Sequence, residues 1–233
     1  MRYTSRTHIG AVRKLNEDAI IARPEIGVFA VADGMGGHAA GDVAAQIVVE
    51  MLAMIPVGLG PSELLQAVRG AIHEAHDEIR QESERRGGVT IGATVVALIL
   101  IDGHYVCLWA GDSRCYQLRD GELEMISADH SLVGELVKDG KLSWDEAEHH
   151  PQANTITRAV GVGDALEIDK KMGESLAGDR FMICSDGLTR YAGSMEIESY
   201  LRHRPIETVA DTLLEIALDG GGADNISVIV VEV

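Results

Sequence analysis

Four aspartates stand at the ends of apolar, strand-like segments, each beside glycine or another small residue. They are Asp33 in VFAVADG, Asp112 in VCLWAGDS, Asp186 in FMICSDG and Asp224 in GGADN, which precedes the last apolar segment. One interpretation is that each aspartate only forms a turn, because Asp-Gly and Asp-Asn are common turn residues. The other is that the four converge, and their mutual repulsion in a partly buried place then requires a counter-charge. Hard divalent cations with oxygen ligands, Mg²⁺ or Mn²⁺, would supply it.

Glu17 and Asp18 form a further acidic pair, at the mouth of the first expected strand. Zinc is disfavoured, since the nine histidines show no HExxH or other zinc-binding spacing. Two other pairs, Asp102-Gly103 and Asp120-Gly121, each separate two apolar or alternating segments. Asp-Gly suits a type I′ turn, in which both central residues take positive φ. These two pairs therefore predict antiparallel hairpins rather than a site.

The acidic residues must be positioned by strands that are apolar almost throughout and by helices that cover them. The expected strands are 19–22, 28–32, several between 91 and 126, 181–186 and 225–233, and the expected helices are 39–54, 62–85, 195–203 and 205–218. Strands covered on both faces predict an α+β fold, in which a central antiparallel β-sandwich is flanked by helices on both outer faces. No repeat or linker divides the chain, so we expect a single domain over residues 1–233.

The composition limits the class of partner. Asp and Glu number 37 against 20 Lys and Arg, a formal net charge of −17, which argues against nucleic acid or an anionic membrane as a partner. The start of the chain has no apolar signal segment, and the most apolar segment, 95–101, is too short to span a bilayer. Cys107, Cys115 and Cys184 lie in strand-like segments without C-x-x-C spacing, so we expect buried free thiols and a cytoplasmic protein.

Eight short motifs follow one another along the chain in an order typical of one protein family. They are GAVRKLNED (10–18), VADGMGGH (31–38), IGATVV (91–96), AGDSRCY (110–116), DHS (129–131), HPQANTITRAVG (150–161), CSDGLT (184–189) and ADNISVIVV (223–231). Each motif alone is weak, but the set in this order resembles the metal-dependent protein phosphatases of the PPM/PP2C type. The resemblance runs from about Thr7 to the C-terminus, and NED and DGMGGH resemble the bacterial branch.

The resemblance implies the same sandwich fold and a metal centre, residue by residue. Asp33 would bridge two metal ions, and the backbone carbonyl of Gly34 would bind one of them. Asp186 and Asp224 would complete this binuclear centre. Asp112, with Asp186, matches the residues that hold a third ion in bacterial members.

Further positions surround the metal centre in the resemblance. Glu17 and Asp18 match an acidic pair that anchors metal-bound waters, and Asn225 belongs to the same surrounding layer. The polar segment 131–165 matches a flap-like insertion. Arg13 matches the arginine that binds phosphate, although taken alone it reads as a surface residue paired with Glu17 or Asp18.

The implied reaction is hydrolysis of phosphoserine and phosphothreonine by a water molecule that bridges two Mg²⁺ or Mn²⁺ ions. A guanidinium group such as that of Arg13 can hold two phosphoryl oxygens and orient the group for attack. The alkoxide leaving group then needs a proton. Met35 stands where eukaryotic members have a histidine, so His38 is the nearest candidate acid. A substrate-positioning or structural role for His38, with a metal-bound water as the acid, is the alternative.

The implied substrates are phosphorylated proteins, and the implied partner is a Ser/Thr kinase whose action the enzyme reverses. We expect a monomer that binds neither nucleic acid nor membranes. Two alternatives stay open: a catalytically silent member that binds phosphoproteins as a regulatory module, and a small-molecule phosphatase on the same fold. Silent relatives usually lack one or more metal aspartates, whereas this chain has all of them.

Overall fold

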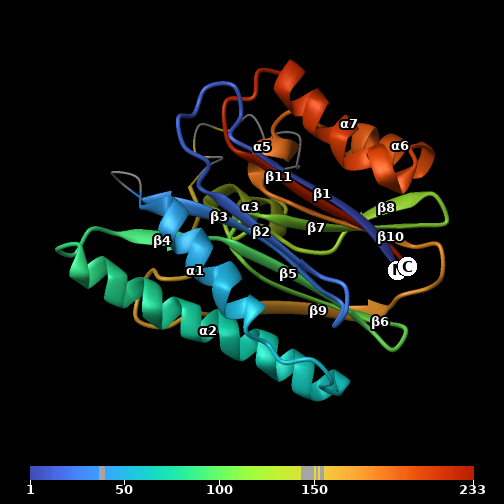
Figure 1. The fold of residues 1–233 in the computed structure, drawn as a ribbon. Coiled ribbons are helices and arrows are strands. Elements are labelled where there is room, and N and C mark those ends of the chain that lie inside the picture. Colours follow the sequence, from blue (N-terminus) through green and yellow to red (C-terminus); the bar gives the residue numbers. More distant parts are fainter. Residues whose placement is uncertain (37–39, 143–149, 151, 153–154) are drawn as a thin grey trace.

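The computed structural model describes residues 1–233 except 37–39, 143–149, 151 and 153–154. Within the described residues, two antiparallel sheets pack face to face, and helices cover the outer face of each sheet (Figure 1). This α-β-β-α layering is the fold class expected from the sequence. It arises because the apolar strands need cover on both faces.

The first sheet holds both ends of the chain. In spatial order it consists of β1 (Arg2–His8), β11 (Ile226–Glu232), β10 (Arg180–Cys184), β7 (Arg114–Arg119) and β8 (Glu122–Met125). β1 pairs with β11 from Arg2 opposite Glu232 to His8 opposite Ile226, so the two termini lie side by side (Figure 1).

The second sheet carries Asp18 and Asp33. Its order is β2 (Asp18–Arg23), β3 (Val28–Gly36), β5 (Val95–Ile101), β6 (His104–Ala110) and β9 (Asp169–Glu174), and β4 (Ile91–Ala93) pairs with the end of β3. The β5–β6 and β7–β8 hairpins turn at Asp102-Gly103 and Asp120-Gly121, where φ is positive at all four residues. Both hairpins predicted from Asp-Gly are therefore confirmed.

Helices cover the two sheets on opposite sides of the sandwich (Figure 1). Their bounds are α1 (Gly41–Ala53), α2 (Pro61–Arg85), α3 (Leu132–Lys138), α5 (Asp186–Thr189), α6 (Ser194–His203) and α7 (Ile206–Asp219). α1 packs on β2 and β3, and α7 packs on β1 and β11. No helix among the described residues combines the length and the apolar composition that a membrane-crossing segment needs.

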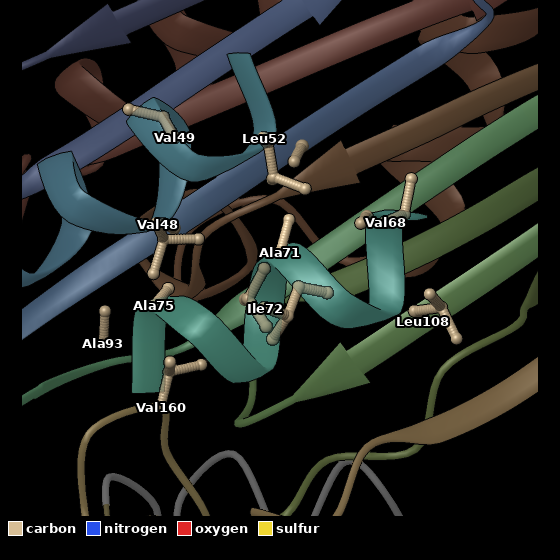
Figure 2. Packing of buried hydrophobic residues seen from close by; sticks show 14 of the residues in the cluster. Val48, Val49, Leu52, Val68, Ala71, Ile72, Ala75, Ala93, Leu108 and Val160 are labelled. Carbon is tan, nitrogen blue, oxygen red and sulfur yellow. The ribbon is translucent and has the colours of Figure 1, made fainter. Parts of the chain in front are cut away.

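Three apolar clusters match the three interfaces between the four layers. One lies between α1, α2 and the second sheet, one lies between the two sheets, and one lies between the first sheet and α5, α6 and α7. Figure 2 shows the first cluster, in which Val48 and Leu52 of α1 and Ala71 and Ile72 of α2 belong to one core. Truncating a fully buried leucine or isoleucine in such a core costs about 2–5 kcal/mol.

Three features differ from the sequence expectation. β3 does not end at Ala32 but continues through Asp33 to Gly36, because β4 pairs with this extension. β1 and β9 were not expected, since their segments RYTSRTH and DKKMGE are largely polar. Both are edge strands with one exposed side, and such strands tolerate polar residues.

The segment 131–165, expected to be a flap-like insertion, includes α3 and most of the residues outside the described ranges. The insertion therefore stays a prediction. At its described end, Val160 bridges to Ala93 of β4, and the Gly161 N–H donates a 2.9 Å hydrogen bond to Nδ1 of the buried His76 on α2.

Candidate active site

A cavity of about 290 Å³ opens where strand ends of the two sheets meet. Eight of the residues singled out from the sequence line it: Arg13, Glu17, Asp33, Gly34, Asp112, Asp186, Asp224 and Asn225. Asp18 lies next to them, opposite Asp33 in the β2–β3 register. His38 falls outside the described residues. Segments far apart in the sequence thus bring the predicted acidic residues together.

The sheet geometry decides where each aspartate points. Asp18 and Asp33 are direct cross-strand partners, so their side chains share one face of the sheet. Asp112 sits in the connection from β6 in the second sheet to β7 in the first. Asp186 begins α5 directly after β10, and Asp224 precedes β11. The cavity is therefore walled by both sheets.

Hydroxyl groups hold two of these segments in place. The Asp33 N–H donates to Thr94 Oγ1 at 3.2 Å, and the Thr94 N–H donates to the Asp33 carbonyl at 2.8 Å. Thr94 Oγ1 also lies 2.7 Å from Ser113 Oγ, next to Asp112 in the chain. Thr94 therefore links the extension of β3 to the loop that carries Asp112.

Hydroxyl groups support Asp18, but one of its carboxylate oxygens has no partner. Ser185 Oγ donates to Asp18 Oδ2 at 2.8 Å, while Asp18 Oδ1 is buried with no hydrogen-bond partner. Burial raises the pKa of Asp18 to about 6, and the charges of Asp186 and Asp224 add to the effect. An orphaned carboxylate oxygen beside other acids indicates a place where a cation belongs.

Three aspartates that line the cavity, Asp33, Asp112 and Asp186, also have raised pKa values. Burial, together with the charges of Asp186 and Asp129, raises the pKa of Asp112 to about 8. Burial and then the neighbouring Asp18 raise the pKa of Asp33, and burial is also the largest cause of the raised pKa of Asp186. Like charges in a partly desolvated site cannot all ionise without a counter-charge.

Gly34 is required by packing. A Cβ atom at this position would lie 2.0 Å from the carbonyl oxygen of Gly41 and 2.6 Å from that of Glu17. The first turn of α1 can therefore approach β3 only because residue 34 has no side chain. Glu17 supports the same junction, since its Oε1 accepts a 3.2 Å hydrogen bond from the Gly41 N–H.

Asn225 organises the loop that carries Arg13. Its Nδ2 donates to the carbonyl oxygens of Ile9 and Leu15, each at 2.9 Å, and its Oδ1 accepts from the Glu17 N–H at 2.8 Å. These three bonds span the segment on both sides of Arg13. The side chain of Asn225 is thus a positioning element for residues 9–17.

Two arginines neutralise the outer carboxylates of the cavity. Arg13 Nη2 lies 2.8 Å from Asp224 Oδ2, so its partner is Asp224 and not Glu17 or Asp18. Arg190 Nη2 lies 3.3 Å from Asp186 Oδ2, and Arg190 Nη1 lies 4.0 Å from Asp224 Oδ2. Arg190 was missed in the sequence because nothing in the local pattern separates it from an ordinary arginine at a helix end.

Thr94 and Ser185 were also missed as site residues, although both lie inside motifs that the sequence shows, IGATVV and CSDGLT. Their hydroxyl groups support Asp33 and Asp18. For Thr94, the available signal was a polar residue inside an otherwise apolar motif, and for Ser185 it was the position directly before Asp186.

A second polar network lies behind Asp112. Arg114 forms an ion pair with Asp129 at 2.8 Å, with both side chains largely buried. The neighbouring His130 stacks on Trp109, and its Nδ1 accepts from the Gly111 N–H at 3.2 Å. Burial lowers the pKa of His130, which favours the neutral ring that this acceptor role needs. The network therefore fixes the Gly111-Asp112 turn from behind.

The donors around the cavity suit a hard divalent cation. They are carboxylate and carbonyl oxygens, the ligands that Mg²⁺ and Mn²⁺ prefer. Among the described residues, no group of three His, Cys, Asp or Glu side chains lies close enough together to hold one metal ion. The carboxylates instead spread over the walls, with two of them turned to arginines. An all-oxygen donor set, in which burial raises the pKa of Asp33, Asp112 and Asp186, fits cations as the missing counter-charge.

Comparison with known proteins identifies the family of the chain. A family model described as protein phosphatase 2C matches residues 6–219. The chain belongs to the protein phosphatase 2C family. The family resemblance expected from the eight motifs is therefore confirmed.

Bacterial members of the protein phosphatase 2C family are similar over the whole chain. The serine/threonine protein phosphatase PstP of Mycobacterium tuberculosis is 38% identical over 234 residues, which cover 100% of this chain and 45% of PstP. The chain thus spans about half the length of that relative. The serine/threonine phosphatase stp of Listeria monocytogenes is 36% identical, and the match covers 97% of this chain and 94% of stp.

Solved structures of the family agree with the fold. PppA, described as a key regulatory component of T6SS in Pseudomonas aeruginosa, superposes with a TM-score of 0.92 at 42% identity, covering 100% of this chain and 97% of PppA. The catalytic domain of PstP, solved in complex with two manganese ions, has a TM-score of 0.85 at 37% identity and covers 99% of this chain. The match covers 97% of that catalytic domain.

Proposed function

We propose that the cavity is the active site of a metal-dependent phosphoprotein phosphatase, which hydrolyses phosphoserine and phosphothreonine. The observation that carries the proposal is the convergence of Asp33, Asp112, Asp186 and Asp224 on one cavity with an arginine at its rim. The bacterial relatives named as serine/threonine phosphatases support the reaction, and the two manganese ions of the PstP catalytic domain support the cofactor.

The metal ligands would be Asp33, the Gly34 carbonyl, Asp186 and Asp224 for two Mn²⁺ or Mg²⁺ ions. A third ion would use Asp112 with Asp186. Bound there, the ions would supply Lewis acidity, which activates water and offsets negative charge on the phosphoryl oxygens. The surrounding residues Glu17, Asp18 and Asn225 would hold this centre in place.

Arg13 would bind and orient the phosphoryl group. Its guanidinium group lies at the rim of the cavity with its side chain 49% exposed, so an incoming anion can reach it. A planar guanidinium donates two parallel hydrogen bonds to phosphoryl oxygens, which holds the phosphorus atom in one orientation for attack.

The leaving alkoxide needs a proton, and the thioether of Met35, which lines the cavity, cannot donate one. His38 therefore stays our candidate acid, with a positioning role as the alternative. The two roles differ in how the rate depends on the leaving group.

The substrates would be phosphorylated proteins, and the physiological partner a Ser/Thr kinase whose products this phosphatase reverses. We place the protein in the cytoplasm, which agrees with its three buried cysteines being free thiols, and we expect it to be a monomer. The presence of every expected acidic ligand favours an active enzyme over a silent binding module.

The test is hydrolysis by the purified chain of a phosphothreonine peptide and of p-nitrophenyl phosphate. We expect turnover with Mn²⁺ or Mg²⁺ and loss of it in EDTA. Asp224→Ala should abolish turnover while the far-UV spectrum is kept. Asp211→Ala, at a partly exposed ion pair with Arg6 away from the cavity, serves as the control. A folded wild-type chain that hydrolyses neither compound with either metal would refute the proposal.

A further inference from the structure

Arg190 reaches into the cavity from the end of α5. Its backbone N–H bonds to the carbonyl of Asp186, so the helix holds the backbone independently of the side chain. The side chain is 32% exposed, and its two terminal nitrogens face Asp186 and Asp224 at 3.3 Å and 4.0 Å.

Arg13 and Arg190 converge on the same atom, although 177 positions of chain separate them. Arg13 Nη2 lies 2.8 Å from Asp224 Oδ2, and Arg190 Nη1 lies 4.0 Å from that oxygen. The two guanidinium groups are therefore no more than about 7 Å apart. A single phosphoryl group with charge-assisted hydrogen bonds of about 2.8 Å on each side can bridge such a gap.

The negative charge around the cavity means that a second basic side chain would help an anionic substrate to bind. The whole chain carries a net charge of −17, and five of the described residues that line the cavity are acidic. Arg13 and Arg190 are the two basic side chains among those lining residues. A dianionic substrate entering this field needs local positive charge at the place where it binds.

We infer that Arg190 is a second phosphoryl-binding residue, which holds with Arg13 opposite sides of one phosphoryl group. The inference rests on the proposed function, because the anion is the phosphate of that substrate. Asp186 and Asp224, the present partners of Arg190, are the carboxylates that would bind metal ions. Cations at those oxygens would compete with the arginines and leave both guanidinium groups available to the substrate.

Two other roles for Arg190 make different predictions. As a plain i,i+4 pair with Asp186, it would affect neither anion binding nor metal binding once metal is saturating. If Arg190 instead binds an acidic residue next to the phosphoserine or phosphothreonine, its loss would weaken binding of peptides with such a residue but not binding of inorganic phosphate. Binding of inorganic phosphate therefore separates the inference from both.

The experiment compares the full-length chain with Arg190→Gln, Arg190→Lys and the control Arg202→Gln. Arg202 also forms an i,i+4 ion pair, with Glu198 on α6, and is 44% exposed, but it does not line the cavity. The dissociation constant of inorganic phosphate is measured by titration calorimetry at saturating Mn²⁺, and Mn²⁺ affinity is measured separately by electron paramagnetic resonance.

We expect Arg190→Gln to weaken phosphate binding by about ten- to a hundredfold, the effect of losing a charge-assisted hydrogen bond. Arg190→Lys should keep part of the affinity, because the point charge remains. Arg202→Gln should match the wild type, and Mn²⁺ affinity in Arg190→Gln should stay equal or rise. With p-nitrophenyl phosphate, KM should rise more than kcat falls.

Phosphate affinity in Arg190→Gln equal to that of the wild type at saturating Mn²⁺ overturns the inference, even if peptides with flanking acidic residues are affected. If the wild type hydrolyses phosphomonoesters in that case, the inference fails alone. If the wild type binds phosphate through Arg190 but hydrolyses no phosphomonoester, the proposed function fails and the binding role stands.

Discussion

Asp18 and Asp33 lie directly opposite each other in the antiparallel pair of β2 and β3, and their side chains share one face of the sheet. Burial, followed by the charge of Asp18, raises the pKa of Asp33. An antiparallel register that places two aspartates side by side destabilises the metal-free fold. It is retained, we propose, because the same register builds the metal centre.

Asp33→Asn should lower the activity without lowering the stability of the metal-free fold. We expect the melting temperature in EDTA to stay equal or rise, since one charge leaves the repelling cluster. Activity with Mn²⁺ should fall by about a thousandfold or more, because the proposed bridging ligand is weakened. Thermal denaturation and kcat/KM with p-nitrophenyl phosphate are the two measurements. Near wild-type activity in Asp33→Asn would remove Asp33 from the metal centre.

The metal-free chain should lose stability as pH rises. In the folded chain the pKa of Asp18 is about 6 and that of Asp112 about 8, both above the ordinary aspartate value. The folded state therefore holds these protons more tightly than the unfolded state, and their stabilisation is lost as pH rises through about 6 and then about 8.

Melting temperatures in EDTA should accordingly fall by several degrees between about pH 5 and 8.5. Saturating Mn²⁺ should remove most of this fall. Asp112→Asn should flatten the upper part of the profile while leaving the lower part. A metal-free profile that rises with pH across this range would contradict the assignment of the raised pKa values.

Gly34→Ala should prevent α1 from packing on β3. The added Cβ would meet the Gly41 carbonyl oxygen at 2.0 Å, and β3 cannot move away from α1 without disturbing its pairing with β4. We expect a loss of about 3 kcal/mol or more in unfolding free energy, measured by urea denaturation. Gly70→Ala is the matched control: this glycine lies within α2 with nothing within 4 Å of the added atom. It should gain about 0.5–1 kcal/mol.

Asp129→Ala should strongly destabilise the fold, because it leaves the largely buried guanidinium group of Arg114 without its carboxylate. Breaking a buried ion pair by removing one partner costs about 3–5 kcal/mol. The exposed pair of Asp139 with Lys141 provides the control, and Asp139→Ala should change the unfolding free energy by less than about 1 kcal/mol. Equal effects of the two substitutions in urea denaturation would show that the buried network contributes little.

Much of the fold could be predicted because it rests on local signals. The Asp-Gly turns at 102–103 and 120–121 adopt positive φ as expected, and the apolar strands are covered on both faces. The polar edge strands β1 and β9 could not be predicted, since their hydrogen-bonding partners, β11 and β6, lie far away in the sequence. Their pairing, rather than their composition, makes them strands.

The sequence by itself predicted the five acidic residues that line the cavity, because the motifs and the residue types within them can be read directly from it. Only the tertiary structure decided what those residues touch. Arg13, which follows β1, pairs with Asp224, which precedes the neighbouring strand β11. Arg190 turns to the same oxygen, and Gly34 is required by the backbone of α1. Each of these contacts joins segments that are separated along the chain. Their distances follow from how the two sheets and their helices pack, and no local pattern contains that information.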